Sequence, residues 1–371
     1  MAYTTIDDPS AHFQLGTYTS NTSAEVACTF DGNSAMQPDL VINFDRDVGQ
    51  SRPVVDSARG VDKILLTNGD YVENHGSYGT YFKSFDSDGF TVNDEASFFN
   101  YGTSKMLSPS WKGNGGTNTA VAESGSGDGG INACTHQAND TAGFSIIKYT
   151  GHRGAGIGDG NHTNVTHGLS AAPTLVIIKN LETASNWIVL GAALAQYSGA
   201  FANRHLKLND TSVRDGGDYV SNTAPDSNYV YVGNNDEVNK DGEELIMYAW
   251  HEVQGYSKFG AYEGNGDANG SFVYTGFKPA FIMLKNIDSS SSTAWRMWDT
   301  KRNTYNVANK WLDANDPDAE GTSSVDMDIL SNGFKPRVDQ VSHNSSGETH
   351  AYMAFAEQPF VTSGGVPATA R

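Results

Sequence analysis

The acidic segment Asp86-Ser87-Asp88-Gly89 comes nearest, by residue type, to a metal site. Alternate carboxylates can converge on a hard cation such as Ca²⁺. The segment lacks the bidentate glutamate that a calcium loop carries further along the chain, and Asp-Gly is a common hairpin dipeptide. The sequence therefore predicts a hairpin turn and no metal site here. Asp86 and Asp88 are the candidate ligands if a cation does bind.

Trp311 is the candidate ligand-binding residue, because it lies in the polar stretch 309–313. An indole exposed there would stack on a sugar or on a partner protein. Trp111 and Trp250 instead occupy comparable ends of a repeated pattern, where Phe355 stands in the third copy. That substitution pattern favours a core role for these three residues.

No arrangement of residues predicts catalysis. A Gly-x-Ser-x-Gly elbow between a strand and a helix, the mark of many hydrolases, does not occur. Glycoside hydrolysis needs two carboxylates about 5–10 Å apart, and nothing singles out such a pair among the 43 acidic residues. We therefore predict a protein that is not an enzyme, with no catalytic residue and no cofactor.

The charge balance excludes several classes of partner. The chain has 24 basic and 43 acidic residues, a net charge of −19. Nucleic acid would repel such a surface, and no run of about 18 apolar residues predicts membrane insertion. The N-terminal segment 1–9 has no signal-peptide pattern, and Cys28 and Cys134 make no disulfide framework. These features predict synthesis and folding in a reducing cytoplasm.

One pattern of strands recurs three times along the chain. In each copy a strand begins next to a proline, where the missing N–H does a sheet no harm; these are Pro38, Pro173 and Pro279. The second and third copies end with a polar, glycine-containing turn that leads into a further strand, which is a hairpin signal. The repeat is about 100 residues long, the size of a β-sandwich domain.

The repeat predicts the fold class and the domains. Glycine makes up 40 of the 371 residues and aromatic residues 11%, which favours short strands and turns over long helices. We expect an all-β protein of three tandem β-sandwich or jelly-roll-like domains. The expected units are a first domain at 1–112, a Gly/Ser/Asn-rich linker or long loop at 113–141, a second domain at 142–254, a third at 255–360 and a C-terminal tail at 361–371.

The repeat sequences resemble a family of repeated-domain virion structural proteins of marine bacteriophages, which are tail-fibre-like and carry a domain of unknown function. The first copy departs from the family pattern, because Ser104-Lys105-Met106-Leu107-Ser108-Pro109-Ser110-Trp111 replaces an apolar strand, and we expect that strand to be altered. The matching segments cover most of the chain and lie at residues 1–9, 37–41, 85–90, 255–260, 272–281, 299–302 and 353–371.

The resemblance implies a protein of the virion, made in the host cytoplasm. Its implied partners are other virion proteins, further copies of itself in a homo-oligomer such as a trimer, and a glycan of the host surface. Binding would lie in loops on a β-scaffold, with weak contacts multiplied by copy number. Two alternatives stay open: a purely structural capsid decoration or tail connector, and a glycan-degrading spike enzyme.

Overall fold

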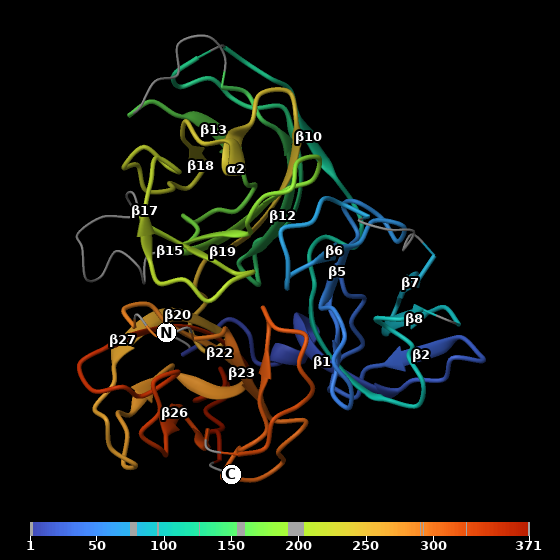
Figure 1. The fold of residues 1–371 in the computed structure, drawn as a ribbon, viewed down its shortest axis with the longest axis vertical. Helices are drawn as coiled ribbons and strands as arrows, with labels where there is room; N and C mark the ends of the chain where they lie inside the picture. The colour runs from blue at the N-terminus through green and yellow to red at the C-terminus, as the bar shows by residue number, and fades with distance from the viewer. Residues whose placement is uncertain are drawn as a thin grey trace.

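A computed structural model shows three β-rich lobes arranged around a common centre (Figure 1). The first lobe, in blue, holds β1 to β9, the second holds β10 to β19, and the third, in orange and red, holds β20 to β27. The structure describes residues 3–74, 80–94, 96–125, 127–153, 160–191, 204–289, 291, 293–323 and 325–369. Within these ranges the helices are the short η1 (Pro9–Ala11) and α2 (Asp236–Asn239), so the predicted all-β class is confirmed.

Each lobe contains a large antiparallel sheet with one shared order of five strands, in which the last strand of the lobe is second and pairs with the strands listed first and third. In the first lobe the order is β1 (Phe13–Thr19), β9 (Lys105–Trp111), β3 (Leu40–Ile42), β5 (Pro53–Asp56) and β6 (Leu65–Leu66), with β4 (Phe44–Asp45) also on β9. In the second it is β12 (Phe144–Thr150), β19 (Glu244–Trp250), β14 (Leu175–Asn180), β15 (Ile188–Gly191) and β16 (Arg204–Lys207). In the third it is β20 (Ser257–Glu263), β27 (Thr349–Pro359), β22 (Phe277–Asn286), β23 (Arg296–Asp299) and β24 (Leu312–Asp313).

A smaller sheet in each lobe makes the second layer of a sandwich. The small sheets are β2 (Val26–Thr29), β8 (Gly89–Val92) and β7 (Phe82–Asp86); β13 (Thr163–Thr166) and β18 (Tyr229–Val232); and β21 (Val273–Tyr274), β26 (Gly333–Pro336) and β25 (Met327–Leu330). In the first lobe Phe82 and Phe90 of the small sheet share one buried cluster with Val41 and Val55 of the large sheet. Corresponding clusters fill the other two lobes. Burying apolar side chains between two layers is what stabilises such sandwiches.

The opposite faces of the three large sheets meet in one central core that includes residues of every lobe. Trp111, Trp250 and Phe355 take the same place on the last strand of each lobe. The ring centroids of Trp111 and Trp250 lie 6.1 Å apart, and those of Trp111 and Phe355 lie 5.4 Å apart. All three side chains are buried, so the predicted core role is confirmed.

The contacts between lobes run in a cycle. The residue just before β5, β15 or β23 donates a side-chain hydrogen bond to a backbone carbonyl of another lobe, at the end of β6, at the end of β16 or in the segment after β24. The three bonds are Trp187 Nε1 to Leu66 O at 2.9 Å, Trp295 Nε1 to Lys207 O at 2.8 Å and Arg52 Nε to Asp316 O at 2.9 Å. The second lobe thus binds the first, the third binds the second and the first binds the third, which gives the chain an internal threefold arrangement.

A buried asparagine precedes the last strand of every lobe. Asn100, Asn239 and Asn344 are fully buried, and the amide of each donates to backbone carbonyls within its own lobe. The backbone N–H of each also bonds the carbonyl four residues earlier. Because buried backbone carbonyls need partners, these asparagines fix the turn that leads into the central strand.

The altered strand expected in the first lobe is present as β9, seven residues long and buried from Met106 to Trp111. Ser108 finds a partner, because its Oγ donates to Asn43 Oδ1 at 2.6 Å. Pro109 has no N–H. It lies opposite the gap between β3 and β4, where neither strand pairs with β9, so no hydrogen bond is lost there. The polar strand therefore keeps its place through local partners rather than through hydrophobicity.

Residues 113–141, expected as a linker or long loop, contain two strands. These are β10 (Thr119–Val121) and β11 (Cys134–Asn139), and β11 pairs antiparallel with β12 at the edge of the second lobe's large sheet. The sequence of this segment predicts a loop because β11 is polar, whereas in the structure backbone pairing with β12 holds it as a strand. The boundaries of the three expected domains stay a prediction.

Candidate functional sites

The predicted turn at Asp86 and Asp88 joins β7 to β8. Asp86 accepts hydrogen bonds from Ser84 and Thr91, both at 2.7 Å. The backbone N–H of Met36 donates to Asp88 at 3.2 Å. Gly89 has a φ of +107°, and a Cβ on it would lie 1.9 Å from a backbone oxygen, so only glycine fits this turn. Both carboxylates thus have protein partners.

Trp311 lies in the wall of the third lobe's core. The guanidinium carbon of Arg296 stands 3.8 Å from the centre of its ring, a cation–π contact, and Arg296 also pairs with Asp313 at 2.9 Å. A Cβ on Gly321 would lie only 2.1 Å from the indole, so the backbone there packs directly on the ring. These contacts account for the placement of Trp311, and sugar binding by it stays a prediction.

An aromatic patch of Tyr3, Phe272 and Tyr274 lies on the third lobe and was not predicted from the sequence. Val273, at the start of β21, is buried, so its neighbours Phe272 and Tyr274 point outward and are 49% and 52% exposed. Tyr3 joins them from the N-terminal segment, with 3.1 Å between the hydroxyls of Tyr3 and Tyr274. The alternation of aromatic and apolar residues at 272–274 could have predicted the two exposed rings. Tyr3 could not be added from sequence, because it is 271 residues from Tyr274.

The hydroxyl of Tyr3 is fixed in the patch. It donates to the backbone oxygen of Gly276 at 2.7 Å. Burial, followed by the hydrogen bond with Tyr274, raises the pKa of Tyr3 to about 12, so the hydroxyl stays protonated at neutral pH. The patch therefore combines two exposed ring faces with two oriented hydroxyls, which suits a ligand that has both apolar faces and hydroxyl groups.

A second candidate site is the cleft between the first and third lobes, with a volume of about 780 Å³. One wall is β1, with the segments before it and after β2, and the other is formed by β22, the end of β27 and the loop after β23. The residues that line it are Asp7, Asp8, Pro9, Ser10, Phe13, Gln14, Leu15, Thr17, Asp31, Gly32, Asn33, Ala280, Thr300, Lys301, Thr304, Ala356, Glu357 and Gln358. Lys301 pairs with Asp31 across the cleft.

Hydrogen bonds lower the pKa values of two acids of the cleft, Asp7 and Asp8. Ser363 donates both its hydroxyl and its backbone N–H to Asp7, which lowers the pKa of this carboxyl. Burial alone would raise the pKa of Asp8, but hydrogen bonds from Ser10 and Ser34 outweigh it and the net direction is downward. A general acid for glycoside hydrolysis needs the opposite shift. The cleft is therefore anionic and suited to binding.

The equivalent junction between the first and second lobes is closed by residues 113–139. The carboxylate of Asp39 accepts from the backbone N–H groups of Gly113, Gly115 and Gly116, at 2.8–2.9 Å. It also accepts from the hydroxyl of Ser57 at 2.6 Å. This single buried carboxylate anchors the segment that leads to β10 and β11.

A buried ion pair also holds this closed junction. Arg59 Nε lies 2.6 Å from Asp56 Oδ2, and both side chains are almost fully buried. Tyr248 of the second lobe donates to the same carboxylate at 2.7 Å. Burial alone would lower the pKa of Arg59, but Asp56, Tyr248 and Glu73 raise it, so the guanidinium stays charged. The third lobe has the same buried ion pair at the equivalent position, between Asp299 and Arg302.

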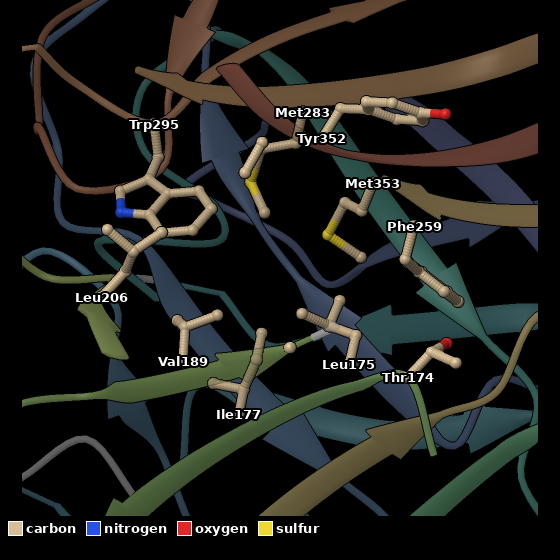
Figure 2. Close-up of a pocket in the computed structure, with 12 residues that line it drawn as sticks. Thr174, Leu175, Ile177, Val189, Leu206, Phe259, Met283, Trp295, Tyr352 and Met353 are labelled. Atoms are coloured by element: carbon tan, nitrogen blue, oxygen red, sulfur yellow. The ribbon is translucent and has the colours of Figure 1, made fainter. Parts of the chain in front are cut away.

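Among the described residues, the junction between the second and third lobes has neither an ion pair at this place nor an open cleft. Gly191 ends β15 where Asp56 and Asp299 end the equivalent strands. Around it the two lobes enclose a small apolar pocket, with Ile177 and Val189 on one side and Met283 and Trp295 on the other (Figure 2). Its volume of about 30 Å³ is room for about one water, and an apolar cavity of that size stays dry. We read it as a packing gap between lobes.

Across the described residues, no group of three or more His, Cys, Asp or Glu side chains could hold a metal ion. Cys28 and Cys134 are both free and buried, and burial raises the pKa of each thiol. Within the same part of the chain, no helix is long and apolar enough to cross a membrane.

Comparison with known proteins gives one match. A family model described as a domain of unknown function, DUF7483, matches residues 8–359. No curated protein and no solved structure matches the chain. The matched range runs from the segment before β1 to the end of β27 and so covers all three lobes. The chain therefore belongs to the family defined by this domain, DUF7483.

Proposed function

We propose that this chain is a structural protein of a bacteriophage virion, in a tail or fibre, that adheres to a glycan on the host surface. The aromatic patch of Tyr3, Phe272 and Tyr274 carries the proposal for the ligand. Sugar rings present apolar C–H faces and hydroxyl groups, and the patch offers exposed aromatic faces beside oriented hydroxyls. The resemblance of the repeats to virion structural proteins supports the location.

Binding rather than cleavage fits the electrostatics of the molecule. The carboxylates Asp7 and Asp8 of the large cleft have lowered pKa values, so neither is held protonated for general acid catalysis at neutral pH. The aromatic patch itself contains no acidic residue. We therefore propose a protein that is not an enzyme and binds without cofactor.

Copy number would supply the strength of adhesion. The patch lies on β21 of the third lobe, and the equivalent small-sheet strands β2 and β13 carry Val26 to Thr29 and Thr163 to Thr166, with no aromatic residue. Of the three equivalent strands in the described part of the chain, β21 alone carries such a patch, and many weak contacts on one particle add up to firm attachment. The homotrimer stays a prediction, which light scattering of the purified chain would test.

Glycan screening with matched variants tests the ligand. We expect the Phe272→Ala/Tyr274→Ala variant to bind host glycan about tenfold more weakly, because each lost ring contact is worth about 0.5–1.5 kcal/mol. Tyr101→Ala is the control, since Tyr101 is 46% exposed but lies in the first lobe. Equal binding by the double variant and the wild type would refute the patch as the glycan site.

Immunogold labelling of intact virions tests the location. Antibody against the purified chain should place gold at the tail or at fibre tips, as seen by electron microscopy. Gold spread over the head would contradict the adhesin and favour a capsid decoration.

A further inference from the structure

The first strand of each large sheet has one edge turned away from the last strand, and the three lobes treat this edge differently. In the second lobe the edge of β12 is completed by β11. In the third lobe the carboxylate of Glu252 accepts from the backbone N–H of Phe259 at 3.1 Å, which caps the edge of β20. In the first lobe β1 ends the sheet and its outer edge lines the 780 Å³ cleft.

The hydrogen-bond pattern shows which groups of β1 face the cleft. Lys112 N donates to His12 O, and Ser20 N donates to Ser104 O. In an antiparallel pair the bonded positions alternate, so the even-numbered residues of β1 bond β9. The backbone groups of Phe13, Leu15 and Thr17 then point outward, and all three residues line the cleft. In the described part of the chain these outward groups have no hydrogen-bond partner.

The second lobe shows the same edge occupied. Phe13 and Phe144 are equivalent, because they pair with Trp111 and Trp250 on the last strands. Thr150 N donates to Ala133 O, so the even-numbered residues of β12 bond the β11 side. The outward backbone groups of Phe144, Ile146 and Lys148 therefore face β11. An added strand at this edge is thus a geometry that the fold already accepts.

We propose that the cleft binds an extended, cationic segment of a partner protein as an added strand, antiparallel to β1. From Phe13 to Thr17 the edge spans about 14 Å at about 3.4 Å per residue, enough to pair five residues. The main-chain bonds would give affinity, as they do wherever a peptide extends an open sheet edge. This site shares no residue with the aromatic patch, and the proposal does not depend on glycan binding.

The charge of the cleft selects the partner. Asp7, Asp8, Asp31 and Glu357 line it together with one base, Lys301. Asp31 pairs with Lys301, and Glu357 pairs with Lys278 at 3.0 Å, so the negative charge of the cleft comes chiefly from Asp7 and Asp8. Hydrogen bonds hold the pKa values of Asp7 and Asp8 down, so both stay negative at neutral pH. A second copy of the chain, at a net charge of −19, would be repelled, whereas a lysine- or arginine-rich strand would be attracted.

A synthetic strand tests the proposal. The probe is a peptide of alternating lysine and valine, seven residues long, that carries a fluorescein label; the full chain is titrated into it and the fluorescence anisotropy is measured. Thr17→Pro removes one outward N–H and leaves the pairing with β9 intact, since proline is tolerated at an edge that faces away from its neighbour. We expect this variant to bind at least tenfold more weakly and Thr17→Val, which keeps the N–H, to bind like the wild type.

Two further measurements keep the test decisive if Thr17→Pro fails to fold. The same peptide with every amide N-methylated keeps its charge but has no N–H donor, and we expect it not to bind. Hydrogen exchange at the amides of Leu15 and Thr17 should slow at least tenfold when the unmodified peptide is added. Equal binding of both peptides, unchanged exchange, or a dimer of the chain that Thr17→Pro dissociates would each overturn the proposal.

Discussion

The junction between the first and second lobes is filled, whereas the equivalent junction between the first and third lobes is open. The filled junction holds β11 against β12 and the Asp39 carboxylate on three backbone N–H groups. A buried aspartate–arginine pair lies at the same place in both junctions, Asp56 with Arg59 in the first lobe and Asp299 with Arg302 in the third. The open junction holds the cleft, bridged by the ion pair of Lys301 and Asp31 at its surface. Three lobes with one sheet order therefore do not give three equal surfaces.

The difference teaches where a repeated fold can carry function. The parts that all three lobes share, such as the central aromatic residues and the buried asparagines, stabilise the fold. The parts that differ lie at the junctions, where an inserted strand, a glutamate cap or an open edge can occupy the same place. The two proposed binding sites lie at such places, one at a junction and one at the outer face of a single lobe.

The largest effect is expected from breaking the ion pair of the filled junction. Arg59→Met leaves the carboxylate of Asp56 buried without its countercharge and should lower the free energy of unfolding by about 3–5 kcal/mol. Chemical denaturation measures it. The double variant Asp56→Leu/Arg59→Met removes both charges and should recover most of the loss. A single variant as stable as the wild type would show that the pair does not hold the junction.

Detaching the inserted segment should cost somewhat less. Asp39→Ala removes the acceptor of three backbone N–H groups and of Ser57, and should lower the free energy of unfolding by about 2–4 kcal/mol. Asp39→Asn keeps one acceptor oxygen in the same place and should lose less. Hydrogen exchange should speed up in β11 as well. Unchanged exchange there would mean that β11 holds to β12 without this anchor.

Much of this architecture was predictable from the sequence, and the junctions were not. Two features of the sequence indicated the β class: the alternating strands and the prolines at their starts. The core was indicated by the equivalent positions of Trp111, Trp250 and Phe355 in the three copies. Hydrophobic pattern says which face of a strand is buried but not which lobe covers it, so the meeting of β1 with the third lobe was hidden. The sequence did not predict the strand β11, because pairing with β12 and not hydrophobicity holds it in the sheet. It did not predict the aromatic patch either, because Tyr3 is distant in sequence from the other two rings.

A smaller effect, visible in the pH dependence of stability, concerns the junction of the second and third lobes. Lys285 is buried and donates to the backbone oxygens of Thr211 and Thr293 at 2.9 and 2.6 Å. Burial lowers its pKa from 10.5 to about 8, and that of Lys179 likewise to about 8. Between pH 8 and 10 the unfolded chain binds more protons than the folded one, so stability should rise with pH, by at most ~1.4 kcal/mol per pH unit for each lysine.

The variant Lys285→Met should flatten that rise. Urea denaturation at pH 7, 8, 9 and 10 measures the slope in both proteins, and Lys285→Met should lose about half of it because Lys179 remains. Slopes that agree within error would show that Lys285 does not change its charge in this range.

The smallest effect is expected at Trp311. Trp311→Ala loses the stacking on Arg296, worth about 0.5–2 kcal/mol, together with the packing on Gly321. If Trp311 serves packing, thermal unfolding shifts downward and glycan binding is unchanged. Weaker glycan binding without a loss of stability would instead assign the ligand to Trp311.

Hydrogen exchange at the three first strands, without any added peptide, tests the central comparison most directly. The amides of Phe13, Leu15 and Thr17 at the open edge should exchange at least tenfold faster than those of Phe144, Ile146 and Lys148, which β11 covers. The amide of Phe259, capped by Glu252, should lie between them. Equal protection of the β1 and β12 amides would contradict an open edge in the first lobe and with it the proposed strand partner.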